Sequence, residues 1–561
     1  MRRTGQTLIE KIAQRHAVGI TSCVRAGDFV TIEPHRCMSH DNAGAVMAKF
    51  ASMNVPAVCN PGQIVFTLDH NVQDRGDANL RKYRNIEAFA QQHGIDFHPA
   101  GRGIGHQVMI EEGHVLPGKM VVASDSHSNM YGGLGCLGTP VVRTDAASIW
   151  ATGRTWWQVP PTARVNLTGA LPPGSTSKDL IIMLCGHFCE DEVLNHAIEF
   201  VGDGVASLSI EDRLTVANMS TEWGALAGVF PADERTFEWL YERSGFLSQR
   251  GPAGVPSDTS AANTANAAGN EYEHPRLTRA VVDGIVHEAR VGDSLRASDD
   301  AEYSRELAFD LSAVQPHISG PNHVKTMTSL AAIEGEKIMI QKAYIVSCVN
   351  SRASDISAAA AVLSGKQVAP GVELYVAAAS SEVEAECTRR GDWQALLDAG
   401  ARPLPPGCGP CVGLGAGLLR AGEVGISATN RNFKGRMGSR DAQAYLASPA
   451  VVAASAAAGY ICSPATLSGA LDTSATIGGR DSMATGATAG LARLVDATAR
   501  RQPVYRDPSD TVQIVPGFPD KLSGTLLYCS QNDINTDGIF AGTHTCKLLW
   551  SCSNAPEASS S

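Results

Sequence analysis

Three cysteines are the residues of this sequence best suited to hold a metal. Two of them, Cys408 and Cys411, lie in the run Gly-Cys-Gly-Pro-Cys-Val-Gly at residues 407–413. Glycines let the backbone approach a bound group closely, and backbone N–H groups can then donate to its sulfur atoms. A third, Cys348, follows the apolar run 342–346. Three thiolates would leave one iron of a four-iron cluster without a protein ligand. That iron could then bind substrate and act as a Lewis acid.

Two other interpretations apply to a Cys-x-x-Cys pair taken alone. A closed structural zinc site requires four ligands. The sequence has no second Cys-x-x-Cys to supply the other two, which disfavours zinc. A redox pair of the thioredoxin type would precede a helix in a much smaller domain. Both stay open as alternatives to a cluster at this point.

Acidic residues and histidines supply candidates for proton transfer. The candidates are Asp69, His70, His106, Asp125, His127 and Glu222. A carboxylate beside a histidine raises the pKa of the ring and orients it, which keeps a proton available near neutral pH. Arg431 and Arg436 suit substrate carboxylates, because a planar guanidinium binds them through two parallel hydrogen bonds. Taken singly, each histidine could be structural and each arginine could lie on a solvated loop.

Short apolar runs precede several of these residues and indicate the elements that position them. The run 121–123 leads into Ser-Asp-Ser-His, the run 342–346 leads into Ser-Cys, and 373–377 is a third such run. Strand, polar loop and helix in alternation predict an α/β fold with mainly parallel sheets. In such sheets the ligand crevice lies at the carboxyl ends of the strands.

Composition narrows the classes of function. The chain has 561 residues, more than one hydrophobic core supports, and 43% of them are apolar. A net charge of −11 without a long basic run argues against nucleic-acid binding. The sequence contains no run of about 18 apolar residues, so it predicts no membrane span. The start of the sequence has neither a signal region nor a long presequence, which predicts a cytoplasmic protein with reduced thiols.

Several collinear motifs resemble the aconitase superfamily, and most closely its homoaconitase branch. They are the runs at 125–128, 132–135, 218–225, 347–352, 407–413 and 428–438. The resemblance covers roughly residues 5–465 and a short stretch near 516–545. It implies three α/β domains around a central cleft, at 1–165, 166–315 and 316–465, with a flexible insertion at 248–270. A linker at 466–515 and a truncated swivel-domain stub with a disordered tail at 516–561 would follow.

The resemblance also implies a cofactor and roles for the site residues. One [4Fe–4S] cluster per chain would be bound by Cys348, Cys408 and Cys411, with one iron not ligated by protein. Asp69 and His70 would protonate the departing hydroxyl, while Asp125 pairs with His106 and Glu222 with His127. Substrate would be bound by His40, Ser126, Asn218, Asn430, Arg431 and Arg436. Where aconitases proper carry glutamine this sequence has His40, which fits the homoaconitase-like branch.

The implied activity is that of a hydro-lyase acting on a small di- or tricarboxylate. A 2-hydroxy tricarboxylate would be isomerised through a cis-alkene, with homocitrate to homoisocitrate in lysine biosynthesis as the first expectation. A paralogue acting on a 2-substituted malate, such as 2-(4-hydroxybenzyl)malate for L-homotyrosine, is the alternative. A non-catalytic iron-sensing or iron-binding protein, or an inactive truncated product, is the alternative from another class.

The family places its catalytic base, a serine next to an arginine, on a C-terminal swivel domain. No such motif follows the run 532–537, which resembles the opening loop of that domain. We therefore expect either a separate small swivel-domain subunit or a truncated chain. Fungal homoaconitases are mitochondrial, which makes mitochondria the alternative location.

Overall fold

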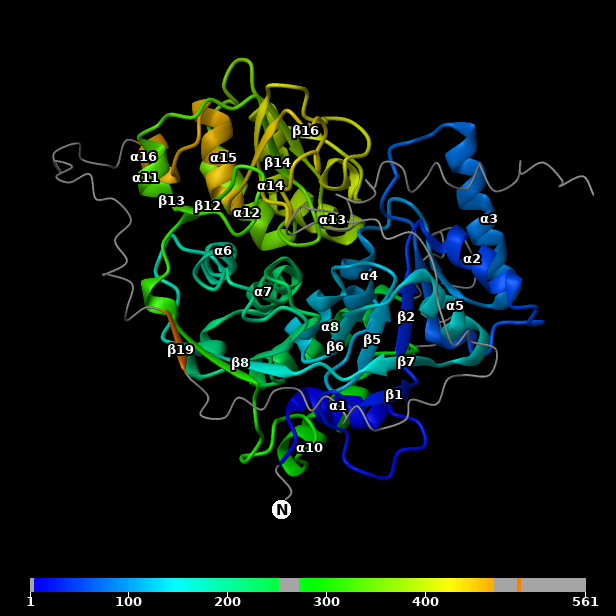
Figure 1. The fold of residues 1–561 in the computed structure, drawn as a ribbon. Helices are drawn as coiled ribbons and strands as arrows, with labels where there is room; N and C mark the ends of the chain where they lie inside the picture. The colour runs from blue at the N-terminus through cyan, green and yellow to red at the C-terminus, as the bar shows by residue number, and fades with distance from the viewer. Residues whose placement is uncertain (1–4, 252–271, 469–491, 496–561) are drawn as a thin grey trace, which may run out of the picture. The chain divides into compact units, whose positions relative to one another are not determined.

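Four β-sheets organise the part of the chain that the computed structural model describes, which is residues 5–251, 272–468 and 492–495 (Figure 1). These residues all fall in the first of the chain's two units, Met1–Thr498. Most neighbouring strands run parallel, because helical connections return the chain to the same end of each sheet. The predicted α/β class with mainly parallel sheets is confirmed.

The first sheet is wholly parallel and has the strand order β4-β3-β2-β5-β6. Its strands are β2 (Arg36–Ser39), β3 (Ile64–Thr67), β4 (Asp96–His98), β5 (Met120–Ala123) and β6 (Leu137–Pro140). β3 and β5 are buried at every position, which explains their almost unbroken apolar sequences. From β2 the next strands along the chain are added on one side of the sheet, and from β5 on the other side. The loops at the carboxyl ends of the strands on either side of such a switch point form a ligand crevice.

The second sheet has seven strands in the order β13-β12-β18-β17-β14-β15-β16. They are β12 (His317–Ser319), β13 (Met327–Ser329), β14 (Lys342–Ile345), β15 (Glu373–Val376), β16 (Arg402–Pro403), β17 (Val424–Ser427) and β18 (Gln443–Leu446). The strands from β18 to β16 are parallel, and β12 and β13 form an antiparallel edge. β14 pairs with β17, so the loops that follow these two strands lie at the same edge.

The third sheet has the order β10-β9-β8-β11-β19. Its strands are β8 (Thr162–Thr168), β9 (Ala197–Val201), β10 (Ala227–Val229), β11 (Arg305–Asp310) and β19 (Ala492–Val495). β19 runs antiparallel to β11 and comes from the stretch at 466–515 that was expected to be a linker. A separate antiparallel pair joins β1 (Phe29–Ile32) to β7 (Thr155–Gln158).

Helices connect these strands, and α4 and α7 carry site residues. The α-helices are α1 (Leu8–His16), α2 (Ala43–Ser52), α3 (Asp77–His93), α4 (Gly105–Glu111), α5 (Arg143–Thr152), α6 (Ser177–His187), α7 (Ile210–Trp223), α8 (Glu234–Arg250), α10 (Arg279–Val291), α11 (Leu330–Glu334), α12 (Ala353–Leu363), α13 (Ser381–Arg390), α14 (Asp392–Asp398), α15 (Pro449–Ala458) and α16 (Pro464–Leu467). α7 begins at a capping box in which Ser209 and Asp212 satisfy each other's backbone N–H groups. It ends at Gly224, which adopts the left-handed conformation that glycine reaches at little cost.

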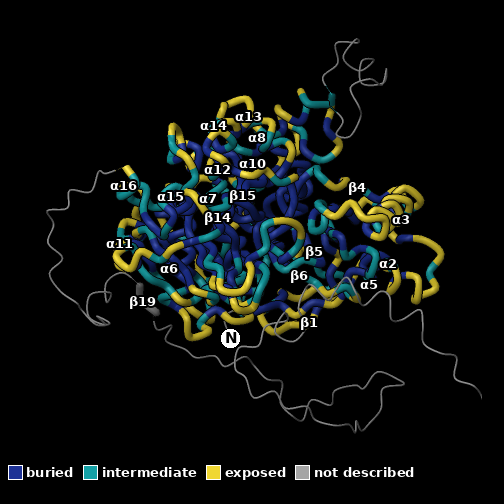
Figure 2. Tube along the Cα trace, turned by 90° about the horizontal axis from the view of Figure 1, so that it is seen from above, coloured by how far each residue is buried: buried dark blue, intermediate teal, exposed yellow. Residues whose placement is uncertain are grey.

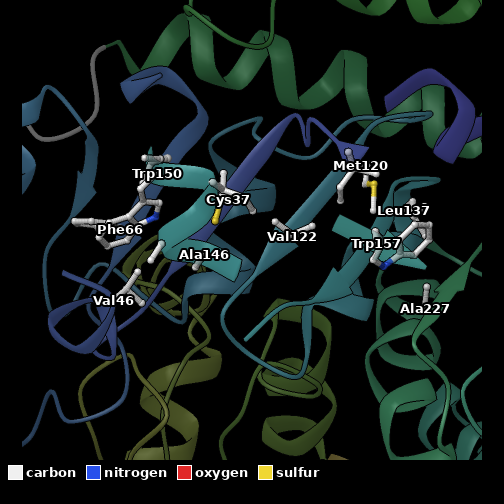
Figure 3. Close-up of a cluster of buried hydrophobic side chains, with 14 of the residues drawn as sticks. Cys37, Val46, Phe66, Met120, Val122, Leu137, Ala146, Trp150, Trp157 and Ala227 are labelled. Atoms are coloured by element: carbon white, nitrogen blue, oxygen red, sulfur yellow. The ribbon is translucent and has the colours of Figure 1, made fainter. Parts of the chain in front are cut away.

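Apolar side chains on one face of the first sheet pack against α2 and α5. Phe66 of β3 and Trp150 of α5 are fully buried, with their ring centroids 5.0 Å apart (Figure 3). Burial of each aromatic ring stabilises the fold by about 1.5–3 kcal/mol. Figure 2 shows that buried residues follow the strands, while α3 presents an exposed outer surface.

Some sequence-based expectations fall partly or wholly outside the described residues. α8 continues to Arg250, so the insertion expected at 248–270 starts inside a helix, and residues 252–271 lie outside the description. The swivel-domain stub and tail expected at 516–561 also lie outside it, and the three domain boundaries stay predictions. Within the described residues, no helix has the length and apolar character needed to cross a membrane.

Candidate active site

Loops at the carboxyl ends of the first sheet bring together the histidines and acids proposed from the sequence. His40 follows β2, Asp69 and His70 follow β3, and Asp125 follows β5. His106 lies in the first turn of α4, in the connection that follows β4. Because the four strands are parallel neighbours, residues far apart in sequence meet at one edge.

Asp69 and His70 form a tightly bonded pair. Oδ1 of Asp69 lies 2.5 Å from Nδ1 of His70, and Oδ2 of Asp69 accepts from the N–H of Gly105 at 2.7 Å. Burial alone would lower the pKa of His70, but the charge of Asp69 and the bond with it outweigh burial and raise that pKa to about 9. The His70 ring is therefore protonated at neutral pH.

His40 stacks on His70, with ring centroids 3.8 Å apart and planes 10° from parallel. The Nε2 atoms of both rings face Oδ2 of Asp125, at 3.7 Å from His40 and 3.6 Å from His70. Burial and the charge of His70 lower the pKa of His40 to about 4. A neutral ring thus lies against a protonated one.

Asp125 is the centre of a second group of contacts. Its Oδ1 lies 2.7 Å from Nε2 of His106 and accepts from the backbone N–H of His127 at 2.9 Å. Burial would raise the pKa of Asp125, but His106 and the bond from His127 hold it well below its usual range. On its other side, His127 places Nε2 3.0 Å from Oε1 of Glu222 on α7.

The three cysteines come from loops that follow two strands of the second sheet. Cys348 follows β14, while Cys408 and Cys411 follow β16, and all three side chains are buried. Burial, reinforced by the nearby Cys411, raises the pKa of Cys348 to about 12, and burial also raises that of Cys408. Thiols in such surroundings lose their protons when a positive metal centre binds them.

The glycine-rich turn around Cys408 packs directly against the loop of the acid pair. A Cβ atom at Gly407, whose φ is +159°, would lie 2.6 Å from Cγ2 of Val72 and 2.8 Å from the carbonyl oxygen of Asp69. Only glycine permits this approach. The N–H of Cys408 then donates to the Asp69 carbonyl at 2.7 Å.

Two amide side chains donate hydrogen bonds to the Cys348 sulfur. Nδ2 of Asn218 lies 3.1 Å from Sγ of Cys348, and Nδ2 of Asn430 lies 3.5 Å from it. Asn430 also donates to Oδ1 of Asn218 at 3.1 Å and accepts from the Cys411 thiol at 3.6 Å. Such N–H···S contacts stabilise negative charge on sulfur. The donor set fits a metal centre bound by three thiolates.

The two arginines and Ser126 lie around the same residues. Nε of Arg431 donates to Oε1 of Glu222 at 2.6 Å, and Nε of Arg436 donates to the Cys411 carbonyl at 2.8 Å. Oγ of Ser126 lies 3.5 Å from Nδ1 of His127. The structure thus brings every residue proposed from the sequence into one connected region.

Two residues that the sequence-based proposals missed take part in the contacts. Asp41 accepts from the N–H of Asp69 at 2.9 Å, and the hydroxyl of Tyr131 lies 2.9 Å from Nδ1 of His106. Asp41 directly follows His40, and Tyr131 lies beside the Gly-Gly turn at 132–133. Their positions directly beside His40 and beside the run 132–135 were the available signal.

Comparisons with known proteins identify the relatives of this chain. The model of the aconitase family (aconitate hydratase) matches residues 10–274 and 253–459. "Homoaconitase, mitochondrial" of Mycosarcoma maydis is 53% identical over 96% of this chain and 70% of that protein. Proteins of the same name from Yarrowia lipolytica and Candida albicans are 52% identical, over 97% and 96% of this chain and 74% of each relative.

A solved structure also resembles the chain, at a greater distance. The holo form of aconitase X from Thermococcus kodakaraensis covers 72% of this chain and 84% of that one, with a TM-score of 0.38 and 11% identity. That likeness is too weak to add to the assignment. The family model and the relatives suffice: the chain belongs to the aconitase family and is a homoaconitase-like hydro-lyase.

Proposed function

We propose that this chain binds one [4Fe–4S] cluster through Cys348, Cys408 and Cys411, with one iron not ligated by protein, and interconverts homocitrate and homoisocitrate. The observation that carries the proposal is the 2.7 Å hydrogen bond from the N–H of Cys408 to the carbonyl of Asp69. It holds the loop with two thiols against the loop with the acid pair. Dehydration requires a Lewis acid and a proton donor at the same hydroxyl, so this contact supports the reaction.

His70 is the proposed proton donor. Its Nδ1 is engaged by Asp69, which leaves Nε2 as the atom that gives its proton to the departing hydroxyl. When bound, the cluster supplies a Lewis-acidic iron that draws electron density from that hydroxyl. Asp69 keeps His70 protonated at neutral pH and fixes the plane of its ring.

The arginines and α7 bind and orient the substrate. Arg431 and Arg436 offer planar donors to substrate carboxylates, while Asn218 and Asn430 contact the Cys348 sulfur. Glu222 and Asp125 hold His127 and His106 in fixed orientations. His40 and Ser126 complete the polar surroundings of the substrate in this proposal.

The names of the relatives support the choice of substrate and of pathway. They are homoaconitases, and they are 52–53% identical to this chain over 96–97% of its length. The same names say mitochondrial, which supports a mitochondrial location over the cytoplasmic one expected from the sequence. Fractionation of cells that express the tagged full-length gene product distinguishes the two.

Anaerobic reconstitution followed by turnover assays tests the proposal. The panel contains homocitrate, homoaconitate, cis-aconitate and 2-substituted malates, including 2-(4-hydroxybenzyl)malate. Each substrate is tested with the chain alone and with a swivel domain supplied as a second polypeptide. We expect about four irons per chain and turnover of homoaconitate above the other compounds.

Each contrary result points to a different error. A colourless protein that binds zinc would remove the cluster. Preference for an alkylmalate would replace the substrate while keeping the chemistry. A protein that binds iron but shows no turnover, either alone or with the swivel domain, would favour the non-catalytic iron-binding alternative.

A further inference from the structure

Two buried cations beside the site form no salt bridge among the described residues. Lys178 of α6 is fully buried and Arg352 is 2% exposed. Neither forms a salt bridge with any described residue, whereas two other buried cations do: Arg213 pairs with Asp233 and Lys342 pairs with Glu423. A buried charge without an opposite charge costs several kcal/mol. The negative charge of Asp355 acts on both cations at a distance, but neither cation forms a direct ion pair with it.

Backbone carbonyl groups of two loops accept their hydrogen bonds. Nζ of Lys178 donates to the carbonyls of Ala428 and Thr429, at 3.2 and 2.5 Å. These residues directly precede Asn430 in the loop after β17. Lys178 thus fixes the backbone from which Asn430 reaches the Cys348 sulfur.

Arg352 does the same for the loop after β14. Its Nη1 donates to the carbonyl of Cys348 at 2.9 Å, and Nη2 donates to that of Val349 at 2.7 Å. Nη2 also bonds Oγ1 of Thr215 on α7 at 2.6 Å. Its Nε is buried and has no hydrogen-bond acceptor among the described residues.

Both cations therefore converge on neighbouring loops that carry sulfur or contact it. Burial lowers the pKa of Lys178 to about 8, and the negative charges that oppose this include Asp355, Glu222 and Cys411. Three thiolates in one buried region would repel one another, and cations nearby reduce that repulsion in a medium of low dielectric constant.

We propose that Lys178 and Arg352 are positioning residues for the cluster, which fix the loops of Asn430 and Cys348 and supply the positive charge that three buried thiolates require. The inference rests on the proposed function, because it assumes a cluster on Cys348, Cys408 and Cys411. It gives both cations a role that no ion pair among the described residues accounts for, because the thiolates and the bound cluster would add negative charge to that of Asp355.

Variants that separate charge from hydrogen bonding test the proposal in the full-length chain. Lys178→Gln and Arg352→Gln keep donors but lose the charge, while Lys178→Arg and Arg352→Lys keep the charge. Lys342→Gln, which removes a buried ammonium that Glu423 already balances, is the matched control. For each protein we would measure iron and sulfide content, the rate of iron loss to a chelator, the midpoint potential of the cluster, and Tm with and without cluster.

The expected result is a loss that depends on charge and on the cluster. The two glutamine variants should lose iron about 10- to 100-fold faster than the unchanged chain, as is usual when a group that supports metal ligands is removed. Their midpoint potential should become more negative, because a nearby positive charge stabilises the reduced cluster. The charge-keeping variants and Lys342→Gln should stay close to the unchanged chain.

Other outcomes overturn the inference in distinguishable ways. Equal iron loss and potential in the glutamine variants would remove the charge role while the proposed function stands. An equal drop in Tm with and without cluster, or a variant that fails to fold without it, would show a purely structural role. An unchanged chain that takes up no cluster would remove the inference and the proposed function together.

Discussion

Oε1 of Glu222 lies 2.6 Å from Nε of Arg431 and 3.0 Å from Nε2 of His127, so one oxygen atom joins two groups from different loops. Burial would raise the pKa of Glu222, but His127 and Arg431 outweigh it and lower that pKa to about 2. Its other oxygen is buried without a hydrogen-bond partner among the described residues. An ionised carboxylate in this position orders both side chains before substrate arrives.

Replacement of Arg431 by lysine should raise KM more than it changes kcat. A lysine keeps the charge but cannot bind a carboxylate through two parallel bonds, and loss of one charge-assisted bond corresponds to about 10- to 100-fold in KM. Steady-state kinetics on the preferred substrate measure both constants. Arg81→Lys on the exposed surface of α3 is the control. A fall in kcat with KM unchanged would show that Arg431 acts in the chemical step instead.

Replacement of Asp69 by asparagine should lower kcat by about 10²- to 10⁴-fold, the range typical of positioned acid–base groups. The pKa of His70 is raised to about 9 chiefly by Asp69, so its loss moves that pKa down. His70 then loses its proton at a lower pH than in the unchanged chain. The alkaline limb of the pH profile should therefore begin at a lower pH. A pH profile of kcat measures this shift, with the exposed Asp299→Asn as control. An unmoved alkaline limb would exclude His70 as the acid.

Much of the site could be predicted from the sequence, because local patterns fix which residues follow a strand. The apolar runs before Asp125 and Cys348 predict strands, and β5 and β14 are found there. Polar residues that directly follow parallel strands must gather at one edge of a sheet. The apolar runs therefore predict that each side chain lies at the carboxyl edge of its own sheet, whereas the meeting of the two sheets depends on packing.

The remaining features depend on packing between segments far apart in sequence. The ring of His40 stacks on that of His70 because β2 and β3 are neighbours in the sheet. No local sequence pattern predicts that these two strands pair. Pairing of β19 with β11 joins residues almost two hundred positions apart by backbone hydrogen bonds that carry no sequence signature. Exposure of single residues was also unpredictable: Cys59 follows the apolar Val58 and Cys189 follows the apolar Phe188, yet both cysteines are exposed.

Replacement of Cys348 by alanine should prevent stable binding of a four-iron cluster. Two thiolates from one tight turn hold fewer cluster irons than three, so we expect iron content and visible absorbance to fall after anaerobic reconstitution. Cys185→Ala, which removes a fully buried thiol on α6, is the matched control and should retain both. Equal iron in both variants would require a different third ligand.

Glu199 should make the stability of the fold depend on pH, independently of catalysis. This residue of β9 is buried, and its carboxyl group accepts from the N–H of Ile9 at 3.0 Å and from the hydroxyl of Tyr303 at 2.8 Å. Burial raises its pKa to about 7, above the usual value of 4.5. The folded state therefore keeps the proton at pH values where the unfolded state has released it.

The sign of the effect follows from proton binding. Between pH 4.5 and about 7 the folded state binds more protons, so the free energy of unfolding falls as pH rises. Above that range the loss is complete and amounts to on the order of 3 kcal/mol. Glu199→Gln cannot ionise and keeps both bonding positions, so its Tm should match the unchanged chain at pH 5 and exceed it at pH 8. Glu87→Gln on exposed α3 should leave the pH dependence unaltered, and a lower Tm for Glu199→Gln at pH 8 would contradict the assignment.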